Sequence, residues 1–146
     1  RALWNLYHDT IHAVDCRDYT AEQLAAWAPH EIDDKRWQTK IESINPFVCQ
    51  SGEAIVGYAD LQTDGLIDHF FVHHAWQGKG VAKLLFQTIE SEAAAAKLAK
   101  LHAHVSITAR PFFQSRGFQV VQRQEVVIGE VALTNFLMEK ELTAER

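Results

Sequence analysis

The chain has 146 residues, of which 47% are hydrophobic and 23% are charged, and its formal net charge at pH 7 is −5. This length and composition predict one globular domain over residues 1–146. The negative charge argues against nucleic acid as a partner, because proteins that bind phosphate backbones usually present a basic face. It suits a cationic small molecule better.

The sequence also lacks the marks of a membrane or secreted protein. No apolar run reaches about 18 residues, and the first residues show no signal-peptide pattern. Cys16 and Cys49 are too few for a disulfide framework. We therefore expect a cytoplasmic protein without a membrane segment and with both cysteines reduced.

The first part of the chain is predicted to be helical. Apolar residues recur at helical spacing over residues 2–14, which predicts an amphipathic helix. Thr20, with Gln23 three positions later, has the pattern of a capping box that opens a second helix, and Pro29 ends it. A third helix is expected over residues 34–43.

The pattern then changes to that of strands. Alternating residues predict strands over residues 47–50, 54–61 and 66–73. The turns between them fall at 51–53 and 63–65, where glycine and polar residues gather. We expect these three strands to be antiparallel.

The second half of the chain alternates helix and strand. A helix is expected after Gly80, followed by a strand over residues 101–106, a short helix over 110–116, and a closing hairpin of strands 119–128 and 131–140. The helix after Gly80 is predicted to bury Val81, Leu84, Leu85, Thr88, Ile89 and Ala96.

The junction between the strand at 66–73 and the next helix predicts an anion site. Gly78 and Gly80 let the backbone turn sharply, and the first N–H groups of the helix favour a negative ligand. The nucleotide pattern G-x-x-x-x-G-K-[ST] is absent, because Gly80 follows Lys79 where a hydroxyl is required. The dinucleotide pattern G-x-G-x-x-G fails because Lys83 replaces its third glycine.

The same segment reads V-x-x-x-x-Q-G-x-G-x-A over residues 72–82. It resembles the acetyl-coenzyme A signature Q/R-x-x-G-x-G/A of the GNAT superfamily of N-acetyltransferases. Gln77, Gly80 and Ala82 fill the fixed places of that signature. In this family the backbone amides of the loop hold the coenzyme pyrophosphate.

A second motif supports the resemblance to small, bacterial-type members of the family. Ala109, Phe112, Gly117 and Phe118 match A-x-x-F-Y-x-x-x-G-F, the helix that lies along the pantetheine arm. The resemblance implies an α/β fold with a mixed, mostly antiparallel sheet, splayed central strands and helices on both faces. The family's first strand, which precedes the first helix, is missing here, and we expect a truncated start that leaves the next strand at an exposed edge.

The resemblance further implies acetyl-CoA as the cosubstrate. The residues expected to bind it are Phe71, Val72, His73, Gln77, Gly78, Lys79, Gly80, Val81, Ala82, Ser106, Ala109, Phe112 and Phe113.

One departure from the family bears on mechanism. The tyrosine that protonates the departing thiolate in many members is replaced by Phe113, which has no proton to give. Ser106 stands where the family often has an asparagine facing the coenzyme, and its hydroxyl can still donate a hydrogen bond to the leaving group.

The base that deprotonates the acceptor amine has two candidates. Family members commonly place a carboxylate or histidine on the strand before the loop, which favours Asp68. Its strand face is shared with Phe70 and Val72. His69 is the alternative, but adjacent strand residues point to opposite faces, so both line one cavity only if the strand bulges.

The sequence gives the least information about the acceptor site. In this fold it is built from the first two helices and the last hairpin. Candidate residues are Tyr19, Trp27, Trp37, Asn135 and Phe136, each of which could equally belong to the core. No metal site is predicted, because His69 and His73 would lie roughly 13 Å apart along one strand and no cysteine or carboxylate completes a ligand set.

We interpret the sequence as an N-acetyltransferase that moves an acetyl group from acetyl-CoA to a primary amine of a small molecule by direct attack. Two alternatives stay open. Phe113 motivates an acetyl-CoA-binding module with little turnover, and the family also contains protein N-acetyltransferases. A homodimer is compatible with the sequence.

Overall fold

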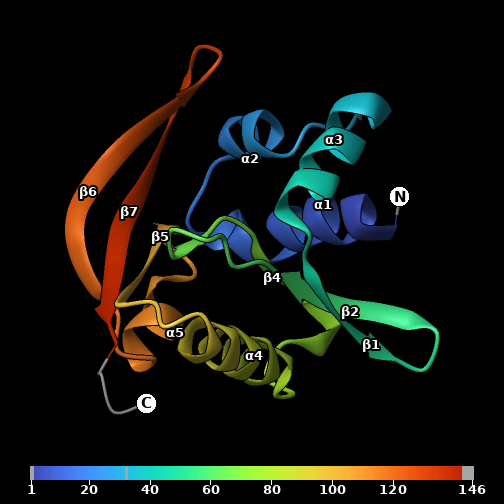
Figure 1. The fold of residues 1–146 in the computed structure, drawn as a ribbon. Coiled ribbons are helices and arrows are strands. Elements are labelled where there is room, and N and C mark those ends of the chain that lie inside the picture. The colour runs from blue at the N-terminus through green and yellow to red at the C-terminus, as the bar shows by residue number, and fades with distance from the viewer. Residues whose placement is uncertain (1, 32, 143–146) are drawn as a thin grey trace.

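The computed structural model describes residues 2–31 and 33–142, in which helices lie on both sides of sheet strands (Figure 1). The first elements are α1 Ala2–Val14, the short 3-10 helix η1 Asp15–Arg17, α2 Ala21–Trp27 and α3 Asp34–Ile44. They are followed by β1 Phe47–Ser51, β2 Ala54–Ala59, β3 Leu66–Ile67, β4 Phe70–Val72, η2 His74–Trp76, α4 Val81–Ala95, β5 Lys100–Ser106, α5 Arg110–Ser115, β6 Gln119–Ile128 and β7 Val131–Glu141. Within the described ranges, no helix is long and apolar enough to cross a membrane.

Local signals set the ends of the early helices. Thr20 accepts a hydrogen bond from the backbone N–H of Gln23 at 3.2 Å, and the Gln23 side chain accepts one from the Thr20 N–H at 2.9 Å. This is the predicted capping box of α2. Helix α3 ends where Asn45 adopts a left-handed conformation (φ 46°) just before Pro46. The three helices predicted for this part of the chain are confirmed.

The strands form two sheets that diverge between β4 and β5. The first has the order β1-β2-β4 and is antiparallel; the second has the order β3-β5-β7-β6, with β3 parallel to β5 and the remaining pairs antiparallel. Helix α1 contacts β2 and β4, whereas α4 contacts the same sheet from the other side (Figure 1). The predicted mixed, mostly antiparallel fold is therefore confirmed, and β1 is the outer strand of the first sheet among the described residues.

The buried face of α4 differs from the prediction. The helix buries Val81, Leu85, Phe86, Ile89 and Ala93 in the main core. Leu84 is 53% exposed, Ala96 is exposed and Thr88 is only half-buried, so these three assignments were wrong. The apolar stripe is rotated by about one residue because Phe86 packs edge-on against Phe112 and Phe118, which anchors that side of the helix to the core.

The single strand predicted over residues 66–73 is also wrong. The chain is extended at β3 and β4, but it leaves regular pairing at Asp68 and His69. The two halves join different sheets: β3 pairs with β5 and β4 pairs with β2. The interruption therefore lies where the two sheets begin to separate.

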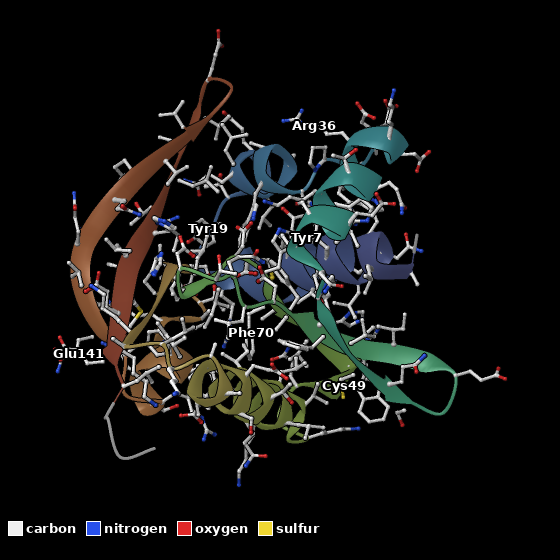
Figure 2. The ribbon with its side chains drawn as sticks, in the orientation of Figure 1. Tyr7, Tyr19, Arg36, Cys49, Phe70 and Glu141 are labelled. Carbon is white, nitrogen blue, oxygen red and sulfur yellow. The ribbon has the colours of Figure 1, made fainter. Side chains whose placement is uncertain are left out.

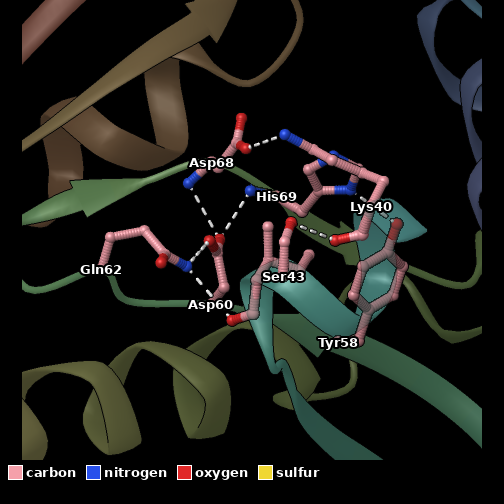
Figure 3. A network of polar contacts seen from close by, with 8 residues as sticks. Lys40, Ser43, Tyr58, Asp60, Gln62, Asp68 and His69 are labelled. Carbon is pink, nitrogen blue, oxygen red and sulfur yellow. Dashed lines mark hydrogen bonds and ion pairs between the residues drawn. The ribbon is translucent and has the colours of Figure 1, made fainter. Parts of the chain in front are cut away.

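A buried carboxylate holds this interruption in place. Asp60 is completely buried, and its Oδ1 accepts hydrogen bonds from the backbone N–H groups of both Asp68 (2.8 Å) and His69 (2.7 Å) (Figure 3). Its Oδ2 accepts a third from Gln62 Nε2 at 2.6 Å. Burial raises the pKa of Asp60, and the hydrogen bonds from His69, Gln62 and Asp68 act in the opposite direction. Two consecutive N–H groups that turn toward one side-chain oxygen cannot also continue a strand ladder.

Removing the Asp60 carboxylate should be costly. In Asp60→Ala the two N–H groups lose their acceptor, and at about 1–3 kcal/mol for each buried unsatisfied group the free energy of unfolding should fall by roughly 3–5 kcal/mol. Urea denaturation followed by circular dichroism measures this change. Asp64→Ala is the matched control, because Asp64 Oδ1 accepts from the Leu66 N–H in an exposed turn; it should cost less than about 1 kcal/mol. Equal losses in the two variants would contradict the role given to Asp60.

Candidate active site

A cavity of about 860 Å³ opens where the two sheets diverge. It extends from the glycine loop before α4, past β4 and β5, to α1 and α2. Most residues expected to bind acetyl-CoA line it: Phe71, Val72, Gln77, Gly78, Gly80, Ala82, Ser106, Ala109, Phe112 and Phe113. One continuous space thus brings together residues that are distant in the sequence.

Three residues of that expected set do not line the cavity. Val81 is buried in the main core. Lys79 places its ammonium over the Trp76 ring, 5.3 Å from the centroid. His73 turns its Nδ1 toward the backbone N–H of Ala75, which donates to it at 3.0 Å. These contacts help to shape the loop and its neighbourhood.

The glycine loop has the geometry of an anion cradle. Gly78 and Gly80 have φ values of 72° and 86°, and a Cβ built on either meets no atom within 4 Å. The space in front of the loop is therefore open, and the unpaired N–H groups of the first turn of α4 lie behind it. Gln77 Nε2 donates to the Val72 carbonyl at 2.8 Å and ties the loop to β4. These features fit the pyrophosphate of acetyl-CoA.

Aromatic side chains form the wall next to α5. Phe113 is 4% exposed and packs edge-on against Phe70 and Phe118, at centroid distances of 5.7 and 5.1 Å. Phe70 lies on the α4 side of its strand (Figure 2) and also contacts Phe112. The ring of Phe113 reaches the cavity, yet most of its surface belongs to the core.

Asp15, which the sequence analysis missed, lies on the opposite wall beside Ser106. Ser106 Oγ accepts a hydrogen bond from the Ala109 N–H at 3.0 Å. Thr108 Oγ1 donates to the Asp18 carboxylate at 2.7 Å, and the Asp15 carboxyl is 6% exposed. Hydrogen bonding by the Thr108 and Ser106 side chains acts to lower the pKa of Asp15. Burial is the main cause that raises the pKa of Asp15 to about 6. No local pattern marks Asp15 in the sequence, because the side chains of Ser106 and Thr108 that surround it belong to a distant segment of the chain.

Asp68 lies at the cavity in a different setting from the one expected. Instead of an apolar neighbourhood it has an ion pair, with Lys40 Nζ of α3 at 2.5 Å from its Oδ2 (Figure 3). About a third of its side chain is exposed (32%). The reason is the interruption after β3, which turns the carboxylate away from the face of Phe70 and Val72 and toward α3.

His69 lines the same cavity as Asp68, because the interruption after β3 breaks the alternation that an unbroken strand would impose. Its imidazole is surrounded by the rings of Tyr7, Trp37 and Phe71, and its Nδ1 lies 2.9 Å from the Tyr58 hydroxyl. Burial is the largest cause that lowers the pKa of His69 to about 4. The ring is therefore neutral at pH 7, and its conjugate acid is stronger than an ordinary imidazolium.

The acceptor candidates divide into two groups. Tyr19, Trp27 and Asn135 line the cavity. Trp37 and Phe136 do not: Trp37 packs edge-on against Trp4 at 5.0 Å, and Phe136 is buried under the Arg110 guanidinium at 4.7 Å.

Among the cavity-lining candidates, Tyr19 also has a clear structural role. Its hydroxyl donates to the Thr134 carbonyl at 2.6 Å and accepts from the Ile107 N–H at 2.9 Å.

Helix α1 supplies cavity residues that the sequence did not single out. Tyr7 lies on the α3 side of β4 (Figure 2), and its hydroxyl donates to the Trp27 carbonyl at 3.1 Å. Thr10 Oγ1 donates to the Val72 carbonyl at 3.2 Å. These bonds fix α1 to both α2 and β4. The helical spacing of apolar residues predicted α1, but it could not show which of its polar groups face a cavity.

A diverging sheet with an open glycine loop at a helix start suits an enzyme that holds a phosphate-bearing cosubstrate in the cleft. Comparison with known proteins identifies the class more closely. Residues 15–142 match the family model described as an acetyltransferase (GNAT) domain. The chain is also 35% identical over 121 residues to the uncharacterized N-acetyltransferase YafP of Escherichia coli strain K12, covering 82% of this chain and 75% of YafP.

Solved structures show the same fold. A GCN5-related N-acetyltransferase from Rhodopseudomonas palustris has a TM-score of 0.88 at 28% identity, covering 95% of this chain and 87% of that one. The PaiA N-acetyltransferase of Thermoplasma acidophilum, solved in complex with coenzyme A, has a TM-score of 0.75 at 13% identity, covering 97% and 91% of the two chains. At that identity, the likeness to PaiA shows the fold alone.

The chain belongs to the GNAT superfamily of acetyltransferases. It is an acetyl-CoA-dependent N-acetyltransferase, which confirms the family and enzyme class inferred from the two sequence motifs.

Cosubstrate affinity should depend on the open space at Gly80. Gly80→Asp adds a side chain and a negative charge where the pyrophosphate is expected, so the Kd for coenzyme A in calorimetry should rise at least about tenfold, or about 1.4 kcal/mol. Gly52→Asp is the matched control, since Gly52 also has a positive φ (60°) and open space around its Cβ, but lies in the β1–β2 turn. Equal affinity in Gly80→Asp and the control would contradict the cradle.

Asp15 should make stability depend on pH. Its pKa rises from 3.8 to about 6 on folding, so the stability it contributes is complete below the unfolded pKa and is lost as the pH rises through the folded one. Asp15→Asn stays neutral throughout. From about pH 4 to about pH 7, its free energy of unfolding should therefore increase relative to the natural protein by roughly 2–3 kcal/mol. Urea titrations at several pH values measure the difference, and a constant difference would exclude the assignment.

Proposed function

We propose that the acceptor is a small-molecule primary amine and that Asp68 is the base. The observation that carries this proposal is the continuity of the cavity, which is lined both by the glycine loop and by Asp68. We further propose that residues 1–146 act as one acetyltransferase domain. Acetyl-CoA supplies the activated acetyl thioester.

Side chains of this protein can accept the proton that the acceptor amine must lose. A primary amine with a pKa of about 10 is mostly protonated at neutral pH and must lose a proton before it can attack. The Asp68 carboxylate attracts such an ammonium group and accepts its proton directly or through one water. Lys40 holds the carboxylate in place and competes with the acceptor for it. We propose that Ser106, which lines the cavity, gives a hydrogen bond to the leaving group in place of its bond to the Asp15 carboxyl, since Phe113 has no proton to offer.

His69 remains the alternative base. It is neutral at pH 7, but its pKa is lowered to about 4 and its Nδ1 is engaged with Tyr58. An imidazole of that kind accepts a proton less readily than an ordinary one. We place Asp68 first because its negative charge also attracts the ammonium form of the acceptor, whereas His69 is neutral and its Nδ1 is engaged.

The shape and charge of the acceptor end favour a small amine over a protein. Tyr7 and Trp27 from the helical layer and Leu133 from β7 bound this part of the cavity. Aromatic walls suit the apolar body of a small amine, and Asp68 and Asp15 provide acidic groups for its cationic end. The alternative of an acetyl-CoA-binding module with little turnover is still supported by Phe113, which cannot donate a proton to the leaving thiolate.

One assay separates these alternatives. Release of free thiol from acetyl-CoA is followed over a panel of small amines and over peptides with free N-termini. Turnover with small amines and none with peptides is the expected result. Turnover with peptides alone would favour a protein acetyltransferase, and binding of coenzyme A without any turnover would favour the binding module.

Replacement of Asp68 tests the base directly. Asp68→Asn should lower kcat by roughly a hundredfold while leaving the affinity for coenzyme A nearly unchanged, because a general base acts on the chemical step. The remaining rate should rise with pH as more free amine forms. Asp64→Asn, in the exposed turn nearby, should keep the natural rate. Undiminished turnover in Asp68→Asn would end the case for this residue, and His69→Gln would be measured next.

A further inference from the structure

Three histidines from separate segments meet outside the acetyl-transfer cavity. His8 and His12 lie one turn apart on α1, and His30 lies in the connection after α2. One ring nitrogen from each lies within 4.8 Å of the others. The ring centroids are 4.3 Å (His8–His12), 4.9 Å (His8–His30) and 4.8 Å (His12–His30) apart. None of the three lines the cavity.

The partners of His8 and His12 fix which nitrogen of each ring carries a proton. His8 Nδ1 lies 3.0 Å from the Asp9 carboxylate, and His12 Nε2 lies 2.7 Å from the Ala28 carbonyl. Both partners only accept hydrogen bonds, so His8 Nδ1 and His12 Nε2 carry the protons. The lone pairs then reside on His8 Nε2 and His12 Nδ1. Histidines that bind metals commonly donate their second N–H to a carboxylate or a backbone carbonyl in this way.

His30 completes the set. Its Nδ1 lies 2.9 Å from His8 Nε2. Two imidazole nitrogens that bind one zinc ion at about 2.0–2.1 Å in tetrahedral geometry lie roughly 3.3 Å apart. The present separation is close to that value, and His30 is exposed, so a small movement of its ring admits the ion. A proton shifts from His30 Nδ1 to its Nε2 when the metal binds, with no net loss.

We propose that His8, His12 and His30 form a zinc site with three protein ligands and a water at the fourth position. Imidazole suits Zn²⁺ among the common divalent ions, and Zn²⁺ accepts this ligand number. The site would link α1 to the segment after α2. The bond from Tyr7 to the Trp27 carbonyl joins α1 to the last residue of α2, just before this segment, so zinc would add a second link within the helical layer.

Calorimetry with ZnCl₂ on chelator-treated protein without a polyhistidine tag tests the site. We expect one zinc per chain in the natural protein, and an affinity at least about tenfold lower in His30→Gln, whose exposed position leaves folding undisturbed. His12→Gln should lose affinity as well. His102→Gln, on β5, is the matched control and should bind as the natural protein does. Co²⁺ in place of zinc should give the visible absorption of a tetrahedral site, which His30→Gln removes.

A thermal measurement gives an independent readout. A ligand that binds only the folded state raises Tm, and at free zinc about a hundred times Kd the rise should be roughly 5 °C or more. The rise should disappear in His30→Gln and persist in His102→Gln. Absence of zinc binding to the natural protein, or equal binding by His30→Gln, would overturn the proposal. Neither result depends on acetyl transfer, so the proposed function is tested separately.

Discussion

The hydrogen bonds from two consecutive backbone N–H groups to the buried Asp60 carboxylate are the constraint on which the candidate site depends. They stop the strand pairing at Asp68 and His69, and the chain resumes as β4 in a different sheet. Without that interruption the two side chains would point to opposite faces. With it, both candidates for the base line one cavity, which opens where the two sheets separate.

The same constraint explains why Asp68 and His69 have such different surroundings. His69 is drawn under Tyr7 and Trp37, where burial lowers its pKa and keeps it neutral. Asp68 turns outward to Lys40, which compensates its charge. A neutral imidazole and a paired carboxylate side by side can coexist at pH 7, whereas two unpaired charges in a half-buried position would each lose solvation.

The sequence correctly predicted the structural features that depend on interactions between neighbouring residues. The capping box of α2 and the glycine loop before α4 depend on neighbours within a few residues, so they could be read directly. Asp15 could not, because its partners Ser106 and Thr108 come from β5 and the segment after it. The interruption at Asp68 was missed because the acceptor of its N–H, Asp60, lies on another element.

The cluster of His8, His12 and His30 is a second case in which contacts between distant segments could not be predicted. His8 and His12 were overlooked in the sequence analysis, although their H-x-x-x-H spacing falls on a predicted helix, and His30 comes close to them only through the fold.

Cosubstrate and acceptor depend on different parts of the fold. The loop before α4 and the wall at α5, the proposed site of the cosubstrate, are anchored to the main core through Val81, Phe86 and Phe113. The proposed acceptor end is covered by α1 and α2, which pack through two smaller apolar clusters, one around Ile11, Leu24 and Leu133 and one around Leu6, Ile44 and Tyr58. Polar bonds from Tyr7 and Thr10 add to this packing. Since these clusters of buried residues are distinct from the main core, a substitution in the helical layer need not empty the core that supports the glycine loop.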